Sequence, residues 1–180
     1  MTTAQEIMIR DAEEFEQEAI AHVMLEAYQQ YAFDLPEPRW EEYRNSIRDS
    51  VYGSGPHARI VAELDGEIVG SVQLFLSSEA AYGKPEMGLQ SPIIRLLAVS
   101  PTVRGRGIAT DLIKEAARRS VQLGASTLNL HTSDMMASAV QLYERLGFKR
   151  AYETDTRNGE TLVKGYQLDL SSTSLLERVV

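Results

Sequence analysis

The sequence predicts a mixed α/β domain in which helices flank a mostly antiparallel central sheet. Segments with strand patterns alternate along the chain with segments of helical spacing. Asp-Gly at 65–66 and Asn-Gly at 158–159 each lie between two strand-like segments, and both dipeptides favour type I′ hairpin turns. Residues 93–99 form a nearly continuous apolar run, interrupted only by Arg95, which is typical of a strand buried on both faces.

The first part of the chain predicts a strand over residues 7–10, followed by two helices. Asp11 has the residue type of an N-cap, and Glu14 stands three positions later, as in a capping box. The second helix is expected over 40–51 and ends before a Gly/Pro-rich segment. The apolar stripe of the first helix consists of Phe15, Ala19, Val23, Met24, Ala27, Tyr28 and Tyr31.

The remaining elements alternate strands with helices that end at glycines. We expect, in order, a hairpin over 59–64 and 67–76, a loop over 77–90, a strand over 93–99, a helix over 108–121 capped by Gly124, a strand over 127–132, a helix over 136–146 ended by Gly147, and a hairpin over 148–156 and 161–170. A single domain over 1–170 with a C-terminal tail over 171–180 therefore fits the 180 residues.

Composition narrows the function classes. Cysteine is absent and the three histidines are scattered, so neither a disulfide nor a metal site is expected. No apolar run is long enough for a membrane span, and the first residues do not resemble a secretion signal, which favours a cytoplasmic protein. The net charge of −8 lies almost entirely in residues 1–45, with 11 acids and 3 bases, and this acidity argues against nucleic-acid binding.

The most informative segment follows the buried strand, where Ser100-Pro101 leads into a loop with two glycines and then into a helix. The N–H groups at a helix start have no intrahelical partner, so this arrangement suits a phosphate or pyrophosphate. A Walker A loop is excluded because no glycine is followed by Lys and then Ser or Thr. A dinucleotide loop is disfavoured because Thr110 stands where Gly or Ala is needed, although a nucleotide-dependent enzyme stays an alternative.

Two motifs together resemble the GNAT N-acetyltransferase superfamily. The segment from Arg104 to Ala109 satisfies [RQ]-x-x-G-x-[GA], the pattern of the coenzyme A loop in that superfamily. The segment from Leu142 to Phe148 satisfies L-Y-x-x-x-G-F. The resemblance covers roughly residues 5–170 and implies the GNAT acyl-CoA N-acyltransferase fold, with acetyl-CoA as acyl donor and no metal.

The resemblance also implies roles for individual residues. Tyr143 corresponds to a tyrosine that often protonates the departing coenzyme A thiolate, and Met136 replaces an asparagine that many members place against the cofactor arm. The main chain of Leu97, Ala98 and Val99 is expected to hold the acetyl carbonyl and the pantetheine arm. The pyrophosphate is expected to contact Arg104, Gly105, Arg106, Gly107, Ile108, Ala109 and Thr110.

The acceptor and the general base are not identified by the sequence. His131 is a titratable candidate at a strand end, while Glu26, Tyr28, Tyr31 and Asp34 fall where family members place acceptor-binding helices. The acidic N-terminal region favours a cationic amine, either a small molecule or a peptide. The alternative to an enzyme is a GNAT-fold module that senses acyl-CoA without turnover. A homodimer is compatible with either function.

Overall fold

The computed structural model of the protein describes residues 6–29, 37–53, 55–133, 137–158 and 161–176. It has a mixed α/β fold with a mostly antiparallel eight-stranded sheet and flanking helices, which confirms the predicted fold class. The chain forms two compact units. The first unit comprises Met1–Gln73 and Leu96–Ile113, and the second comprises Leu74–Arg95 and Lys114–Val180. The prediction of a single domain over 1–170 stays a prediction.

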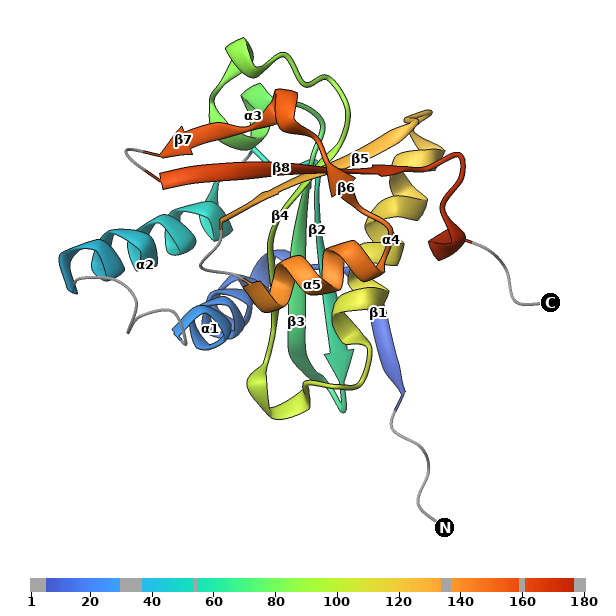
Figure 1. Cartoon of the computed structure of the whole chain (residues 1–180). Helices are drawn as coiled ribbons and strands as arrows, with labels where there is room; N and C mark the ends of the chain where they lie inside the picture. The colour runs from blue at the N-terminus through green and yellow to red at the C-terminus, as the bar shows by residue number, and fades with distance from the viewer. Residues whose placement is uncertain (1–5, 30–36, 54, 134–136, 159–160, 177–180) are drawn as a thin grey trace. The chain divides into compact units, whose positions relative to one another are not determined.

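The first unit contains the N-terminal strands and the two acidic helices (Figure 1). Strand β1 pairs antiparallel with β2, with Ile7 opposite Leu64, and β2 leads into β3 through the expected tight turn. Asp65 and Gly66 have φ values of 53° and 81°, so the type I′ hairpin prediction is confirmed. The elements are β1 (Ile7–Asp11), α1 (Gln17–Tyr28), α2 (Glu37–Tyr52), β2 (Ala58–Leu64) and β3 (Glu67–Phe75), the last of which continues into the second unit.

The start of the first helix differs from the prediction. Asp11 remains in β1 opposite Ile60, and the helix is preceded by a 3-10 turn over Glu14–Glu16. The capping box forms two residues later than predicted: the backbone N–H of Glu13 donates to the Glu16 carboxylate at 2.8 Å. This shift leaves Phe15 outside the apolar face, where its side chain is 84% exposed. The buried residues of α1 are Ile20, Ala21, Val23, Met24, Ala27 and Tyr28.

The second unit contains the C-terminal strands and α5. Strand β4 pairs parallel with β5 at Ile93 and Asn129, and β5 pairs antiparallel with β8 from Thr127 to Thr132. Strand β7 lies beside β8 (Figure 1). The elements are α3 (Ser78–Tyr82), β4 (Ile93–Val99), α4 (Ile108–Gln122), β5 (Thr127–Thr132), α5 (Ala137–Arg145), β6 (Lys149–Arg150), β7 (Thr156–Asn158) and β8 (Thr161–Asp169), with β4 and α4 each shared with the first unit.

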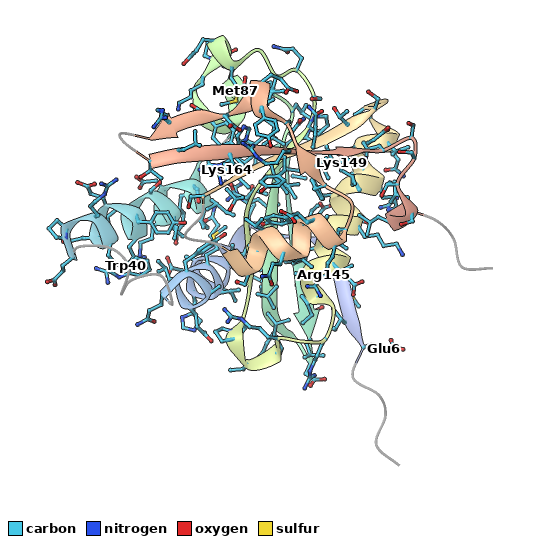
Figure 2. All side chains as sticks on the ribbon, viewed as in Figure 1. Glu6, Trp40, Met87, Arg145, Lys149 and Lys164 are labelled. Carbon is cyan, nitrogen blue, oxygen red and sulfur yellow. The ribbon has the colours of Figure 1, made fainter. Side chains whose placement is uncertain are left out.

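Two segments of the second unit differ from the prediction. The expected loop over 77–90 contains α3, because the Ser77 side chain accepts a hydrogen bond from the Ala80 N–H and caps a helix. The expected strand over 148–156 is interrupted by a 3-10 turn at Tyr152–Thr154, between β6 and β7. Lys149 lies on β6 and Lys164 on β8, as Figure 2 shows. The predicted Asn-Gly turn falls at 158–159, and Gly159 lies outside the described residues.

Candidate active site

Strand β4 is distorted at its midpoint. Leu96 has a φ of 55°, a left-handed conformation that residues other than glycine rarely adopt. Ile93, Ile94 and Ala98 are buried, whereas Leu96, Leu97 and Val99 are only half-buried. The prediction of a strand buried on both faces is therefore wrong for its second half, because the distortion interrupts the regular alternation of the side chains.

The direction of the peptide groups after this distortion follows from two contacts. The N–H of Ser100 donates to the Val69 carbonyl of β3 at 2.8 Å. The carbonyl oxygen of Ala98 lies 3.2 Å from the position that a Cβ on Gly70 of β3 would occupy. Peptide groups alternate between the two edges of a strand, so those of residues 98 and 100 face β3. The N–H groups of Leu97 and Val99 therefore lie on the opposite edge of β4.

Tyr28 of α1 contacts this opposite edge. Its hydroxyl donates to the Leu97 carbonyl at 2.7 Å, and the side chain is 8% exposed. The Tyr28 ring packs edge-to-face on Tyr43 of α2, with the ring centroids 5.9 Å apart. Tyr43 in turn lies 6.0 Å from Trp40, which Figure 2 marks on α2. The Tyr28 hydroxyl thus links α1, one of the helices that the sequence associates with acceptor binding, to β4.

The glycine loop lies on the surface of the first unit. Gly105 and Gly107 have φ values of 82° and 77°, and apart from their chain neighbours no described atom lies within 4 Å of where a Cβ on either residue would be. Both glycines, together with Arg104 and Arg106, are exposed. The backbone conformation therefore requires glycine here, while the space beside each glycine stays open to an approaching ligand.

Helix α4 begins directly after this loop. The N–H of Asp111 donates to the Gly107 carbonyl at 3.0 Å, which makes Gly107 the residue before the first helical turn. The N–H groups of Ile108, Ala109 and Thr110 precede the first intrahelical bond and point out of the helix end. Together with the helix dipole they form a site suited to an anion such as a pyrophosphate.

Gly70 of β3 allows α4 and β4 to approach closely. This residue was not identified from the sequence. A Cβ at this position would lie 3.1 Å from Cγ2 of Ile108, 3.1 Å from Cδ1 of Leu112 and 3.2 Å from the Ala98 oxygen. A side chain at position 70 would therefore collide with both α4 and β4. The signal that could have found it is an isolated glycine inside a strand pattern, which often marks a close backbone approach.

Tyr143 belongs to the second unit and lies on α5. It is 9% exposed, and its ring lies 5.9 Å from that of Phe148 at a tilt of 59°. The N–H of Phe148 donates to the Tyr143 carbonyl at 3.0 Å, and Gly147 between them has a φ of 101°. The L-Y-x-x-x-G-F motif is therefore a helix end in which the glycine reverses the chain and the two aromatic rings pack together. Met136 lies outside the described residues.

His131 is held by hydrogen bonds on both ring nitrogens. Its Nε2 lies 2.8 Å from the Thr154 carbonyl and its Nδ1 lies 2.9 Å from the Tyr82 hydroxyl. Because a carbonyl only accepts, Nε2 carries the proton and Nδ1 accepts from Tyr82. Burial lowers the pKa of His131. Arg95 lies over the Tyr82 ring at 4.9 Å and adds a positive charge nearby. These contacts indicate a structural role for His131 instead of that of a general base.

Two acidic residues of the N-terminal region, Glu16 and Glu26, have partners of their own. Glu26 accepts a hydrogen bond from the Ser100 hydroxyl at 3.2 Å and lies 3.3 Å from Nε2 of His22. Glu16 forms an ion pair with Arg10 at 2.8 Å, and this bond is the largest cause of the lowered pKa of Glu16. Some of the acidic side chains of the N-terminal region are thus engaged in local hydrogen bonds and ion pairs. Tyr31 and Asp34, also suggested for acceptor binding, lie outside the described residues.

No described helix is both long and apolar enough to cross a bilayer. Within the same residues, no group of three or more metal-ligating side chains is placed to hold an ion.

The family assignment rests on a comparison with family models. Residues 11–148 match the model of the acetyltransferase (GNAT) family. The chain belongs to the GNAT acetyltransferase family. The matched segment includes the distorted strand β4, the glycine loop, the start of α4 and Tyr143, so the resemblance seen in the sequence motifs is confirmed.

Curated relatives match part of this chain. The uncharacterized N-acetyltransferase YjgM of Escherichia coli (strain K12) is 32% identical to this chain over 101 residues. The aligned segment covers 55% of this chain and 55% of that protein. Probable N-acetyltransferase family 8 member 5 of Mus musculus is 36% identical to this chain over 90 residues. This segment covers 50% of this chain and 37% of that protein. The matched part of this GNAT protein thus spans about half or less of the length of these relatives.

Solved structures with low identity have the same fold. PaiA N-acetyltransferase from Thermoplasma acidophilum, in complex with coenzyme A, matches 91% of this chain and 99% of its own with a TM-score of 0.68 and 17% identity. The ribosomal-protein-S18-alanine N-acetyltransferase from Escherichia coli matches 92% of this chain and 94% of its own with a TM-score of 0.63 and 19% identity. These similarities confirm the GNAT fold.

Proposed function

We propose that this GNAT protein is an acetyl-CoA-dependent N-acetyltransferase that acts on a primary amine of a small molecule or peptide. The observation that carries the proposal is the exposed two-glycine loop that opens into the N-terminus of α4. Three helix N–H groups and two glycines, each with open space among the described residues where a Cβ would lie, are suited to cradle a pyrophosphate, the charged centre of coenzyme A. Arg104 and Arg106 supply positive charge in the same loop.

The chemistry we propose is direct attack of the amine on the thioester in a ternary complex. The edge N–H groups of Leu97 and Val99 are suited to hold the pantetheine arm and to stabilise the oxyanion that develops on the acetyl carbonyl. Tyr143 is proposed to protonate the departing thiolate, because a phenol keeps its proton at neutral pH. The chain has no cysteine, so the most common acyl-carrying side chain is absent. Direct transfer needs no covalent enzyme intermediate.

The nature of the acceptor and the cellular setting are part of the same proposal. A cationic amine is favoured by the 11 acids in residues 1–45, even though Glu16 and Glu26 have local partners. We further propose a cytoplasmic location and no interaction with nucleic acid. A homodimer is compatible with this function, and light scattering would measure it.

The decisive experiment measures coenzyme A binding and thiol release. Gly107→Val forces a β-branched residue to a φ of 77° and fills the open space of the loop, so binding of coenzyme A should be lost. Gly88→Val is the matched control, because Gly88 has a φ of 73° and equally open space but lies outside the loop. Both variants should lose similar stability, while only the first should lose coenzyme A. Equal affinity in the two variants would contradict the loop assignment.

Thiol release with a panel of amines separates the enzyme from a sensor. Wild-type protein that binds acetyl-CoA but releases no thiol with any amine would favour a GNAT-fold sensor module. Competition of acetyl-CoA with NAD and ATP tests the nucleotide alternative, since preference for either nucleotide would overturn the proposal.

A further inference from the structure

We propose that the Tyr28 hydroxyl is a positioning group for acetyl transfer, which holds the donor edge of β4 in place through the Leu97 carbonyl. This inference rests on the proposed function, because it assigns the edge N–H groups of Leu97 and Val99 to the acetyl group and the cofactor arm. Tyr28 acts through the backbone of β4 and does not itself take part in the chemical step.

The first part of the evidence is the place of the hydrogen bond. Within one residue of a strand, the N–H and the C=O point to the same edge. The Tyr28 hydroxyl lies 2.7 Å from the Leu97 oxygen, so it is bonded to the very edge that presents the Leu97 N–H. Further along the strand, the Ser100 N–H donates to the Val69 carbonyl of β3 on the other edge. The segment from Leu97 to Ser100 is thereby held from both edges of the strand.

The second part is the strained residue that comes just before this bond. Leu96 has a φ of 55°, and such a conformation in a residue other than glycine costs on the order of 1–3 kcal/mol. Strain of this kind persists only where surrounding contacts enforce it. The residue after Leu96 is Leu97, whose carbonyl accepts the Tyr28 hydrogen bond. Because Tyr28 is only 8% exposed, water competes weakly for this carbonyl. Loss of the hydroxyl should let the Leu96 backbone relax and turn the Leu97 N–H away from its direction.

The third part is the support of Tyr28 itself. Its ring packs edge-to-face on Tyr43 at 5.9 Å, with an interplanar angle of 81°. Met24 and Ala27 of the same helix are also buried. A Phe side chain keeps these apolar contacts, so the hydroxyl can be removed alone. The substitution Tyr28→Phe thus removes the bond to the Leu97 carbonyl and keeps the ring contact with Tyr43.

The test compares Tyr28→Phe with Tyr43→Phe, which removes a hydroxyl from the adjacent ring and leaves the Tyr28–Leu97 bond in place. For each protein we would measure kcat with a reactive amine, the Kd of coenzyme A, the Kd of acetyl-CoA and the Tm. Removing one oxyanion-hole donor costs about 10²–10³ in kcat, so loosening such a donor should cost about tenfold. We expect Tyr28→Phe to lower kcat about tenfold, to keep the Kd of coenzyme A within about twofold, and to weaken acetyl-CoA relative to coenzyme A.

Two results would overturn the proposal. One is a kcat and an acetyl-CoA to coenzyme A affinity ratio equal to those of Tyr43→Phe. The other is a parallel loss of kcat, coenzyme A affinity and Tm, which would make Tyr28 a fold-stabilising residue only. The affinity ratio needs no turnover, so it tests Tyr28 even if wild-type protein releases no thiol with any amine, the result that would reject the proposed function instead.

Discussion

Gly70→Ala tests whether the close approach of β3 to β4 and α4 shapes the site. The added Cβ would lie 3.1 Å from Ile108 Cγ2 and 3.1 Å from Leu112 Cδ1, whereas carbon atoms prefer separations of about 3.5–4.0 Å. Ile108 and Leu112 are 2% and 0% exposed, so both side chains are enclosed by the protein. These side chains, or the helix that carries them, must therefore move by a few tenths of an ångström.

The size of the effect follows from two opposing contributions. Overpacking a buried site costs about 1–3 kcal/mol. Replacing Gly by Ala at an unstrained φ lowers the entropy of the unfolded chain and recovers about 0.4–1 kcal/mol, and Gly70 has no positive φ. The net loss in the free energy of unfolding should be about 1.5 kcal/mol, or roughly 3–6 °C in Tm for a protein of this size. Displacement of the α4 N-terminus should also weaken coenzyme A about fivefold, because the N–H groups lose their alignment.

The assays are thermal unfolding and calorimetric titration with coenzyme A. Ser71→Ala is the matched control, since its buried Oγ has no hydrogen-bond partner among the described residues and its side chain points to the other face of β3. Removal of that hydroxyl should leave Tm unchanged or raise it. A Gly70→Ala variant with wild-type Tm and coenzyme A affinity would refute the reasoning.

Three further predictions concern the second unit. Tyr143→Phe should lower kcat about tenfold or more with little change in the Kd of coenzyme A. An unchanged kcat would mean that Tyr143 serves only in packing. Burial lowers the pKa of His131 below 6.5, so its contribution to stability should be complete above about pH 6.5 and should decline as the pH falls through the lower folded-state pKa. The free energy of urea unfolding should therefore differ less between pH 7.5 and 5.5 in His131→Gln than in wild type. The Arg150 guanidinium lowers the pKa of Asp155 to about 2, so Asp155→Asn should lower the free energy of unfolding by about 1–2 kcal/mol near pH 7. This loss should disappear as the pH falls from about 3.9 toward 2, and an equal loss at pH 2 would contradict the prediction.

Two element boundaries differ from the prediction because of contacts that the local pattern does not contain. The capping box was predicted at Asp11 and formed at Glu13, because Asp11 is held in β1 by its pairing with β2. The strand predicted over 148–156 is broken where Arg150 pairs with Asp155 and where Gly165 of β8 lies close to Thr154. Local patterns define which residues favour a helix or a strand, but pairing partners decide where each element stops.

The sequence by itself determined the fold class, the Asp-Gly hairpin, the glycine loop before a helix start and the family. Each of these depends on local chemistry: positive-φ residues at turns, glycines before a helix start, and apolar periodicity. Only the tertiary structure decided which edge of β4 carries the donor N–H groups, that Gly70 must lack a side chain, and that Tyr28 reaches the Leu97 carbonyl 69 residues away. These features depend on how strands and helices pack across long sequence separations, and no pattern within one segment contains that information.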